Sequence, residues 1–191
     1  MNPLNQRLFV ATAFVLFSLP LCAGWKLDDG KVHFFSVKDN IAAVPGTFAV
    51  TGGAKDGSFE VVVNLDTLDT ALPPRDTNIK TALFEVASFP KMVLKGAFPA
   101  DQLPKTVGTT AMVDFKAKLH YRGLSPEITF PMLLIRTDAK TVQAVTPRPV
   151  AVGMADLGLT GAPLEAMMKL CAHQSILPIA FVSFSGTWQA N

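Results

Sequence analysis

The sequence predicts an all-β fold, an antiparallel sandwich or barrel of about eight strands. Three observations support this prediction: apolar and polar residues alternate in several segments, turn residues separate those segments, and few helical segments lie between them. The alternation is clearest over residues 113–122, where every odd position is apolar and every even position is polar. A helix would not sort side chains in this way, so this segment is predicted to be a half-buried strand.

The other elements follow from the same signals in chain order. Pro131 lies within a predicted strand and indicates an edge, a bulge or a strand end, because proline has no N–H to donate to a neighbouring strand. Residues 76–85 can form one or two helical turns, and residues 162–173 are predicted to form a short helix with Pro163 in its first turn. The predicted strands are residues 32–37, 46–50, 59–65, 91–98, 113–122, 128–134, 141–152 and 176–188.

The N-terminal residues 1–23 are predicted to be a secretory signal peptide, followed by a single mature domain over residues 24–191. The segment has one charge, Arg7, before an apolar run of about a dozen residues and a zone of small residues. The run is shorter than the roughly 17 residues that a spanning helix needs, and no second long apolar run follows. The residues before Cys22 do not match a bacterial lipobox, which disfavours lipidation. The mature domain then has one thiol, Cys171, and no internal disulfide.

The composition excludes disorder and gives no signal for nucleic acid. The mean hydropathy is +0.33, the net charge is +2, and 17 basic residues are scattered among 15 acidic ones. Only 17% of the residues are charged, against about 25% in a typical globular protein. A small barrel is either filled by side chains or just wide enough for one ligand. The 14 Phe and seven Met residues suit both an adaptable apolar cavity and an ordinary core, so both alternatives stay open.

Signatures of catalysis and metal binding are weak. The three histidines are far apart in sequence, and none has the spacing of a metal site. Cys171 and His173 are two residues apart, a spacing that does not place them on one face of a helix. The sequence contains no nucleophile elbow, P-loop or dinucleotide fingerprint. We therefore predict no enzyme activity, no metal and no cofactor other than a bound ligand.

A polar cluster follows the third predicted strand. Asp69 is predicted to pair with Arg75 or Lys80, and Asp76 is predicted to be the N-cap of the next helical turn. One interpretation is a polar plug that closes one end of a barrel and satisfies buried carboxylates. The other is a rim that meets the polar end of a ligand.

Two segments, residues 68–92 and 119–126, resemble the YceI-like family, bacterial lipocalin-like proteins that bind polyisoprenoid lipids. The first contains a hydrophobic-Asp-Thr triplet (68–70), an Arg-Asp pair (75–76), a Phe (84) and an aromatic-Pro pair (89–90), as in the hallmark segment of the family. The second, LHYRGLSP, is similar to the strand and turn that precede the next strand in that family. The histidine that follows Arg-Asp in the family is Asn78 here, and residues 160–174 are longer and more helical than the family leads us to expect.

The resemblance implies an eight-stranded antiparallel up-and-down lipocalin-like barrel with one or two short helices. It also implies a periplasmic, non-catalytic carrier whose apolar lumen encloses a long isoprenoid or fatty chain of quinone or polyprenyl type. Apart from the resemblance, we keep a homodimer open as the assembly. Within this frame, strand parity predicts the lining residues Phe35, Val37, Phe48, Val61, Val63, Met92, Leu94, Phe115, Leu119, Phe130 and Met132. The predicted rim consists of Asp69, Arg75, Asp76, Asn78, Lys80 and Phe84.

Two rival functions remain. The first is a ligand-free barrel that acts through protein interactions in a structural or stress-response role, with the same Phe and Met residues as ordinary core. The second is an enzyme or a haem-associated redox partner that uses Cys171 and His173.

Overall fold

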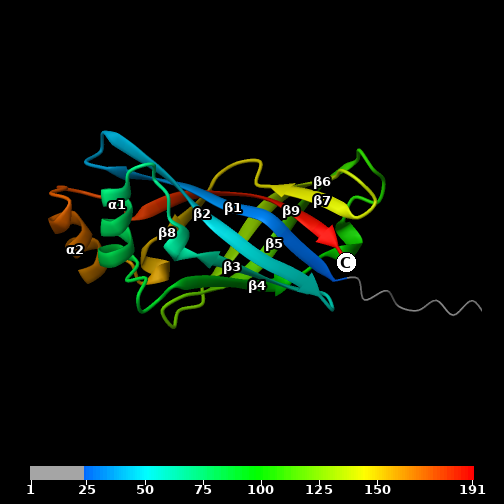
Figure 1. Ribbon diagram of the computed structural model, residues 1–191, viewed down its shortest axis with the longest axis horizontal. Helices are drawn as coiled ribbons and strands as arrows, with labels where there is room; N and C mark the ends of the chain where they lie inside the picture. Colours follow the sequence, from blue (N-terminus) through cyan, green and yellow to red (C-terminus); the bar gives the residue numbers. More distant parts are fainter. Residues whose placement is uncertain (1–23) are drawn as a thin grey trace, which may run out of the picture.

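The computed structural model describes residues 24–191, so the predicted signal peptide and Cys22 lie outside the described residues. Its elements are strands with two short helices, which confirms the predicted all-β class (Figure 1). The helices are α1 (Pro73–Asn78) and α2 (Ala162–Leu170). The strands are β1 (Trp25–Lys38), β2 (Ala42–Lys55), β3 (Ser58–Asn64), β4 (Lys91–Ala97), β5 (Thr110–His120), β6 (Glu127–Arg136), β7 (Thr141–Val145), β8 (Val150–Gly153) and β9 (Ile179–Ala190).

The strands form a closed antiparallel barrel in chain order. Each strand pairs with its predecessor as far as β7, and β1 pairs with β9 to close the sheet. Strands β7 and β8 lie one after the other along the same edge of β9, so together they occupy one of eight strand positions. The single strand predicted over residues 141–152 is therefore wrong, because residues 147–149 leave the sheet between its halves and Pro147 and Pro149 cannot donate to a ladder.

The wall of the barrel is interrupted between β6 and β8. Strand β6 pairs with β7 only through Leu133–Arg136, and among the described strands β8 pairs with β9 alone. The first half of β6, residues 127–132, thus has a strand partner only on its β5 side. The hydrogen bond from the Leu119 N–H to the Pro126 carbonyl sets the phase of the β5–β6 ladder, so the nitrogen of Pro131 faces this unpaired edge. The prediction that Pro131 marks an edge is confirmed.

A bulge in β1 decides which of its side chains face inward. The pairing of β1 with β2 shifts between Leu27 and Gly30, and Asp29 has a left-handed backbone with φ of 50°. Beyond the bulge the Phe34 ring lies over Gly46, where a Cβ atom would clash with it, and stacks on Phe48 at 5.3 Å. Phe34 and its neighbours of the same parity therefore face inward.

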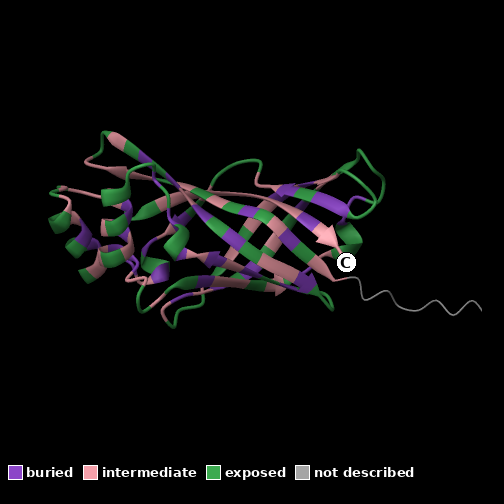
Figure 2. Ribbon diagram, in the orientation of Figure 1, coloured by how far each residue is buried: buried purple, intermediate pink, exposed green. Residues whose placement is uncertain are grey.

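The two ends of the barrel are built differently. At the end that holds residue 24 and the C-terminus, Phe98 lies between Trp25 and Trp188, with ring centroids 6.0 and 5.8 Å apart. Leu134 there is 1% exposed. At the other end lie both helices and the segment that joins β3 to β4 (Figure 1). Between the two ends, buried and exposed positions alternate along the strands (Figure 2).

The predicted helical segments are both present, with different bounds. Helix α1 begins at Pro73, three residues before the predicted start, and continues as a π-helical turn over Ile79–Leu83. Helix α2 ends at Leu170 rather than His173 and has Pro163 in its first turn, as predicted. It packs against the π-helical turn, so the residue 160–174 segment covers the helical end of the barrel.

Candidate functional site

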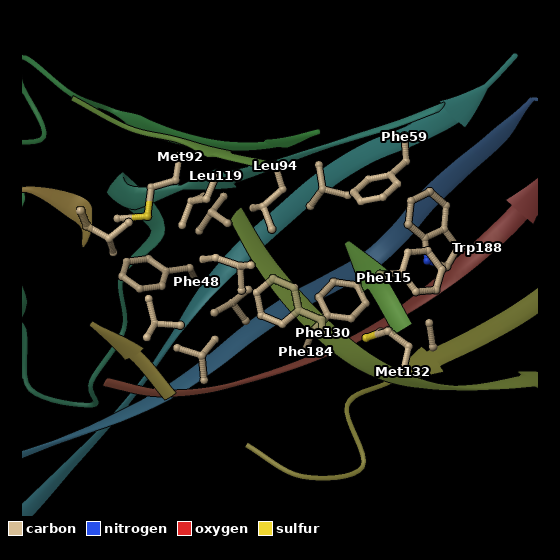
Figure 3. A pocket seen from close by; sticks show the side chains of 18 residues that line it. Phe48, Phe59, Met92, Leu94, Phe115, Leu119, Phe130, Met132, Phe184 and Trp188 are labelled. Carbon is tan, nitrogen blue, oxygen red and sulfur yellow. The ribbon is translucent and has the colours of Figure 1, made fainter. Parts of the chain in front are cut away.

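The interior of the barrel holds an apolar cavity of about 140 Å³. Figure 3 shows Met92 and Phe48 toward one end of it and Trp188 toward the other. Every strand contributes to the wall, and all lining side chains are hydrocarbon, thioether or indole groups. The lining residues are Val32, Phe48, Phe59, Val61, Val63, Met92, Leu94, Phe115, Leu119, Ile128, Phe130, Met132, Ala144, Val152, Leu157, Val182, Phe184 and Trp188.

The structure brings most of the predicted lining residues together and excludes two. The predicted residues that it places on the cavity wall are Phe48, Val61, Val63, Met92, Leu94, Phe115, Leu119, Phe130 and Met132. Phe35 and Val37 were predicted to line the lumen, but they have the opposite parity to the inward-facing Phe34, and Phe35 is 36% exposed on the outer face. That prediction is wrong. Phe34 and Phe35 are adjacent apolar residues, so alternation alone does not tell which of them faces inward. The bulge in β1 and the open space over Gly46, which the Phe34 ring fills, decide in favour of Phe34.

Several lining residues escaped the prediction for identifiable reasons. Phe59 shares its parity with Val61, and Ile128 with Phe130, so alternation could have found both. Val182, Phe184 and Trp188 alternate along β9, but the small residues Ala180 and Gly186 on the same face and the apolar Ile179 and Phe181 on the other weaken the contrast between its two faces. Leu157 lies in a 3-10 turn (Ala155–Leu157), where strand periodicity carries no signal.

The cavity is large enough for a ligand and unsuited to water. A buried water needs roughly 10–15 Å³ and two to four polar partners, and an apolar cavity of this kind stays dry. Several inward-facing residues, among them Leu94, Phe115 and Phe130, are only half-buried, so the side chains do not fill the barrel. The arrangement can accept a hydrocarbon chain and has no group that could perform chemistry on it.

Two residues of the predicted rim, Arg75 and Asp76, form a hydrogen-bonded unit with Thr70 at the helical end. Asp76 is 9% exposed and accepts hydrogen bonds from the N–H of Thr70, at 3.0 Å, and from its hydroxyl. Arg75 donates from Nε to the Thr70 hydroxyl at 2.8 Å and from its terminal nitrogen to the Thr70 carbonyl at 2.6 Å. The N-cap of α1 is Leu72, so the prediction that Asp76 caps the next turn is wrong: its carboxylate folds back to satisfy Thr70 instead.

The other predicted polar residues also have internal partners. Asp69 accepts a hydrogen bond from the Ala71 N–H at 2.7 Å, and Lys80 donates to the Asp66 carbonyl at 2.7 Å. The predicted ion pairs of Asp69 with Arg75 or Lys80 are therefore wrong, because backbone groups of the turn compete for these side chains. Asn78 donates to the sulfur of Cys171, at 3.5 Å, across the contact with α2.

Phe84 connects the polar segment to the cavity wall. Its ring packs edge-on against Phe48, with centroids 5.7 Å apart, and its carbonyl accepts a hydrogen bond from the Tyr121 hydroxyl at 2.8 Å. Burial raises the pKa of the Tyr121 phenol above its ordinary value of 10, so the hydroxyl remains a donor at neutral pH. Because Phe48 lines the cavity, the segment that follows α1 forms the floor of its helical end.

Cys171 and His173 have different partners. His173 Nδ1 lies 3.0 Å from Asp39 Oδ2, at the tip of the β1–β2 hairpin, whereas Cys171 contacts Met167, with 4.0 Å between the sulfurs. Within residues 24–191 no group of three or more His, Cys, Asp or Glu side chains is placed to hold a metal ion. None of the helices in the same range combines the length and hydropathy that crossing a membrane requires.

Comparisons with known proteins agree with this architecture. The family profile described as the YceI-like domain matches residues 25–172. A polyisoprenoid-binding domain from Saccharophagus degradans, implicated in plant cell wall breakdown, superposes with a TM-score of 0.81 at 23% identity, over 87% of this chain and 98% of that one. Burkholderia cenocepacia BcnA has a TM-score of 0.58 at 14% identity, over 84% of this chain and 98% of that one. A Campylobacter jejuni YceI protein has a TM-score of 0.52 at 12% identity, over 79% and 86%. No curated protein matches the sequence.

Proposed function

This chain belongs to the YceI-like domain family, and we propose that it binds a long isoprenoid or fatty-chain lipid, of quinone or polyprenyl type, inside its barrel. The observation that carries the proposal is the cavity of about 140 Å³ with a wholly apolar wall. Each methylene moved from water into such a site contributes roughly 0.8 kcal/mol, so a long chain can be held with little polar recognition. The polyisoprenoid-binding domain with the same fold supports this class of ligand.

We further propose that the protein acts as a carrier in the periplasm, without catalysis. The predicted signal peptide over residues 1–23 supports export. The lining residues, which offer no nucleophile, acid or base, support binding as the role of the lumen.

For the polar cluster we propose the role of a plug. The side chains of Asp69, Arg75, Asp76 and Lys80 all bond to groups of the same segment, so their hydrogen-bonding capacity is directed within the turn. The plug supports the ring of Phe84 against the lumen wall.

The proposal is tested by the lipid content of the gently purified protein. We expect mass spectrometry of an organic extract to find a long-chain lipid in near-stoichiometric amount. Added prenyl lipid at about 100 times its Kd should stabilise the native state by about 2.7 kcal/mol. For a domain of this size that is a rise in Tm of roughly 5–10 °C. Protein that carries no lipid and has the same Tm with and without prenyl lipid would favour the ligand-free interaction module.

A matched pair of substitutions separates an occupied lumen from a filled core. Met132→Trp places a large ring in the cavity, whereas Met112→Trp makes the same change at a side chain that is 58% exposed on β5. We expect Met132→Trp to lose lipid and the lipid-induced rise in Tm while staying folded, and Met112→Trp to keep both. If Met132→Trp instead lowers the free energy of unfolding by about 1–3 kcal/mol and lipid content does not change, the barrel is packed like an ordinary core.

A further inference from the structure

Two aromatic side chains separate the cavity from the packed end of the barrel. Beyond the cavity lies a second, much smaller space of about 10 Å³, which the residues of the packed end enclose. Phe115 and Trp188 border both this space and the cavity, and no other residue within 24–191 borders both. We call these two side chains the aromatic stop. In Figure 3 they lie at the side of the cavity opposite Met92 and Phe48.

The aromatic stop is held by rings on both of its sides. Phe115 packs against Phe59 on the cavity side, with ring centroids 5.7 Å apart, and against Phe98 on the far side, at 6.5 Å. Phe98 also packs against Trp188, at 5.8 Å. Phe59 lies over Gly96, where a Cβ atom would come within 2.8 Å of its ring. Because rings packed in this way do not move without disturbing their neighbours, the position of the stop is fixed.

The inward side chains become larger toward the stop. Along β3 they are Val63 and Val61 and then Phe59, and along β9 the series begins at Val182 and ends at Trp188. A hydrocarbon chain that lies along the lumen therefore has room beside the valines and ends against the rings.

The stop acts through its volume. The side chains beyond it, among them Phe98, Leu103 and Leu134, are buried and apolar, so the surroundings there are as favourable to hydrocarbon as the lumen is. Each methylene that enters an apolar site strengthens binding by about fourfold. Methylenes that reach past the stop would have to displace packed rings, which removes this gain.

From these observations we propose that the aromatic stop sets the greatest chain length that the lumen encloses, so that the protein selects its lipid by chain length. This inference rests on the proposed function and deepens it. Phe115 and Trp188 are then the specificity-determining residues of the lumen, and the selected property is the length of the hydrocarbon chain.

The test is the Kd of lipid-free protein for a series of straight-chain primary alcohols, from hexanol to hexadecanol in steps of two methylenes. Isothermal titration calorimetry measures each value. We expect the Kd to fall by about fourfold for each methylene up to one chain length, and to change by less than about twofold for each methylene beyond it. The length at which the slope changes is the readout, because a loss of stability alone does not move it.

Two substitutions should move this length in opposite directions. Phe115→Ala joins the cavity to the smaller space, so the change of slope should shift to a longer chain by at least one member of the series. Val61→Phe adds a ring on the cavity side of the stop and should shift it to a shorter chain. Val61→Phe also decides the question if Phe115→Ala does not fold, since truncating a packed ring is costly.

Phe130→Ala is the matched control. It removes the same ring as Phe115→Ala, from the neighbouring position on β6, but Phe130 borders the cavity alone. The change of slope should stay at the length found in the unchanged protein. An equal shift in Phe130→Ala would overturn the inference, because total volume rather than the stop would then set the limit.

Two further outcomes separate failure of this inference from failure of the proposed function. Affinity that rises evenly through the longest alcohol, or a change of slope at one length in the unchanged protein, Phe115→Ala and Val61→Phe, rejects the stop and keeps the lipid-binding function. No binding of any alcohol, together with no lipid in the organic extract of the purified protein, rejects the lipid-binding function itself.

Discussion

The two ends of this barrel are closed by different kinds of interaction. At one end, Phe98 packs between Trp25 and Trp188, and a space of about 10 Å³ lies among these rings and their neighbours. At the other end, the carboxylates of Asp69 and Asp76 accept hydrogen bonds from the backbone N–H groups of Ala71 and Thr70. The cavity of about 140 Å³ lies between them.

The difference shows how one apolar composition serves two purposes. Where the indole and phenyl rings of Trp25, Phe98 and Trp188 pack at tilted angles, they fill the barrel and form an ordinary core. In the middle of the barrel the wall combines phenyl rings with the shorter side chains Val61, Val63 and Leu94 of the neighbouring strands β3 and β4, and the cavity remains between them. The two alternatives left open by the composition, a filled core and a ligand cavity, therefore hold in different parts of the same barrel.

The largest expected effect comes from truncating a leucine in each region. Leu134→Ala, at a side chain that is 1% exposed in the aromatic end, should lower the free energy of unfolding by about 2–5 kcal/mol. Leu94→Ala should cost less than about half of that, because Leu94 already borders empty space. Urea unfolding of both variants in lipid-free protein measures the two values. Equal losses would contradict the comparison, since they would mean that the lumen is packed as tightly as the aromatic end.

An intermediate effect is expected at the hydrogen-bonded end. Asp76→Ala leaves the Thr70 N–H and hydroxyl without their buried acceptor and should cost about 1–3 kcal/mol. Asp69→Ala is the matched control, because Asp69 accepts a single hydrogen bond in an exposed turn and should cost about 0.5 kcal/mol. Denaturant unfolding of both variants gives the comparison, since midpoints at equal slopes report the free energy of unfolding directly. If both variants lose the same amount, the buried carboxylate does not close this end.

The smallest expected effect is a dependence on pH of one contact at the helical end. Hydrogen bonds from the Ser175 and Gln174 N–H groups and the contact with His173 hold the pKa of Asp39 below its ordinary value of 3.8. A carboxylate with a depressed pKa stabilises the fold above that ordinary value, and the contribution is lost as pH falls through the depressed pKa. The hydrogen bonds from the N–H groups of residues 174–175 to Asp39, at the tip of the β1–β2 hairpin, should therefore weaken below pH 3.8.

Amide hydrogen exchange at Gln174 and Ser175 measures this effect. Protection should fall between pH 5 and pH 2.5 in the unchanged protein. In Asp39→Asn the protection of these two amides should be low at both pH values. Comparing the two proteins at the same pH removes the dependence of the intrinsic exchange rate on pH. Protection of the Trp188 N–H, in the aromatic end, is the internal control. At each pH it should be the same in Asp39→Asn as in the unchanged protein. Retention of the protection at pH 2.5 would show that the carboxylate does not hold this contact.

Alternation predicted the strands because it reports burial directly. The segment from Val113 to Tyr121 has one apolar face, and the structure turns Val113, Phe115, Ala117 and Leu119 toward the interior as expected. The same reasoning failed at Phe35, because β1 offers apolar residues on both faces and a bulge shifts the phase upstream.

The sequence by itself determined the class of fold, the positions of most strands and much of the lumen wall, because a period of two follows from the pleat of a strand and needs no partner. Only the tertiary structure decided which face of β1 points inward, how β7 and β8 share one edge of β9, and where the polar side chains of residues 69–80 bond. Each of these depends on groups distant in the chain or on competition among several acceptors, such as Gly46 opposite Phe34 and Thr70 beside Asp76. A linear pattern does not contain those distances, which exist only once the barrel has closed.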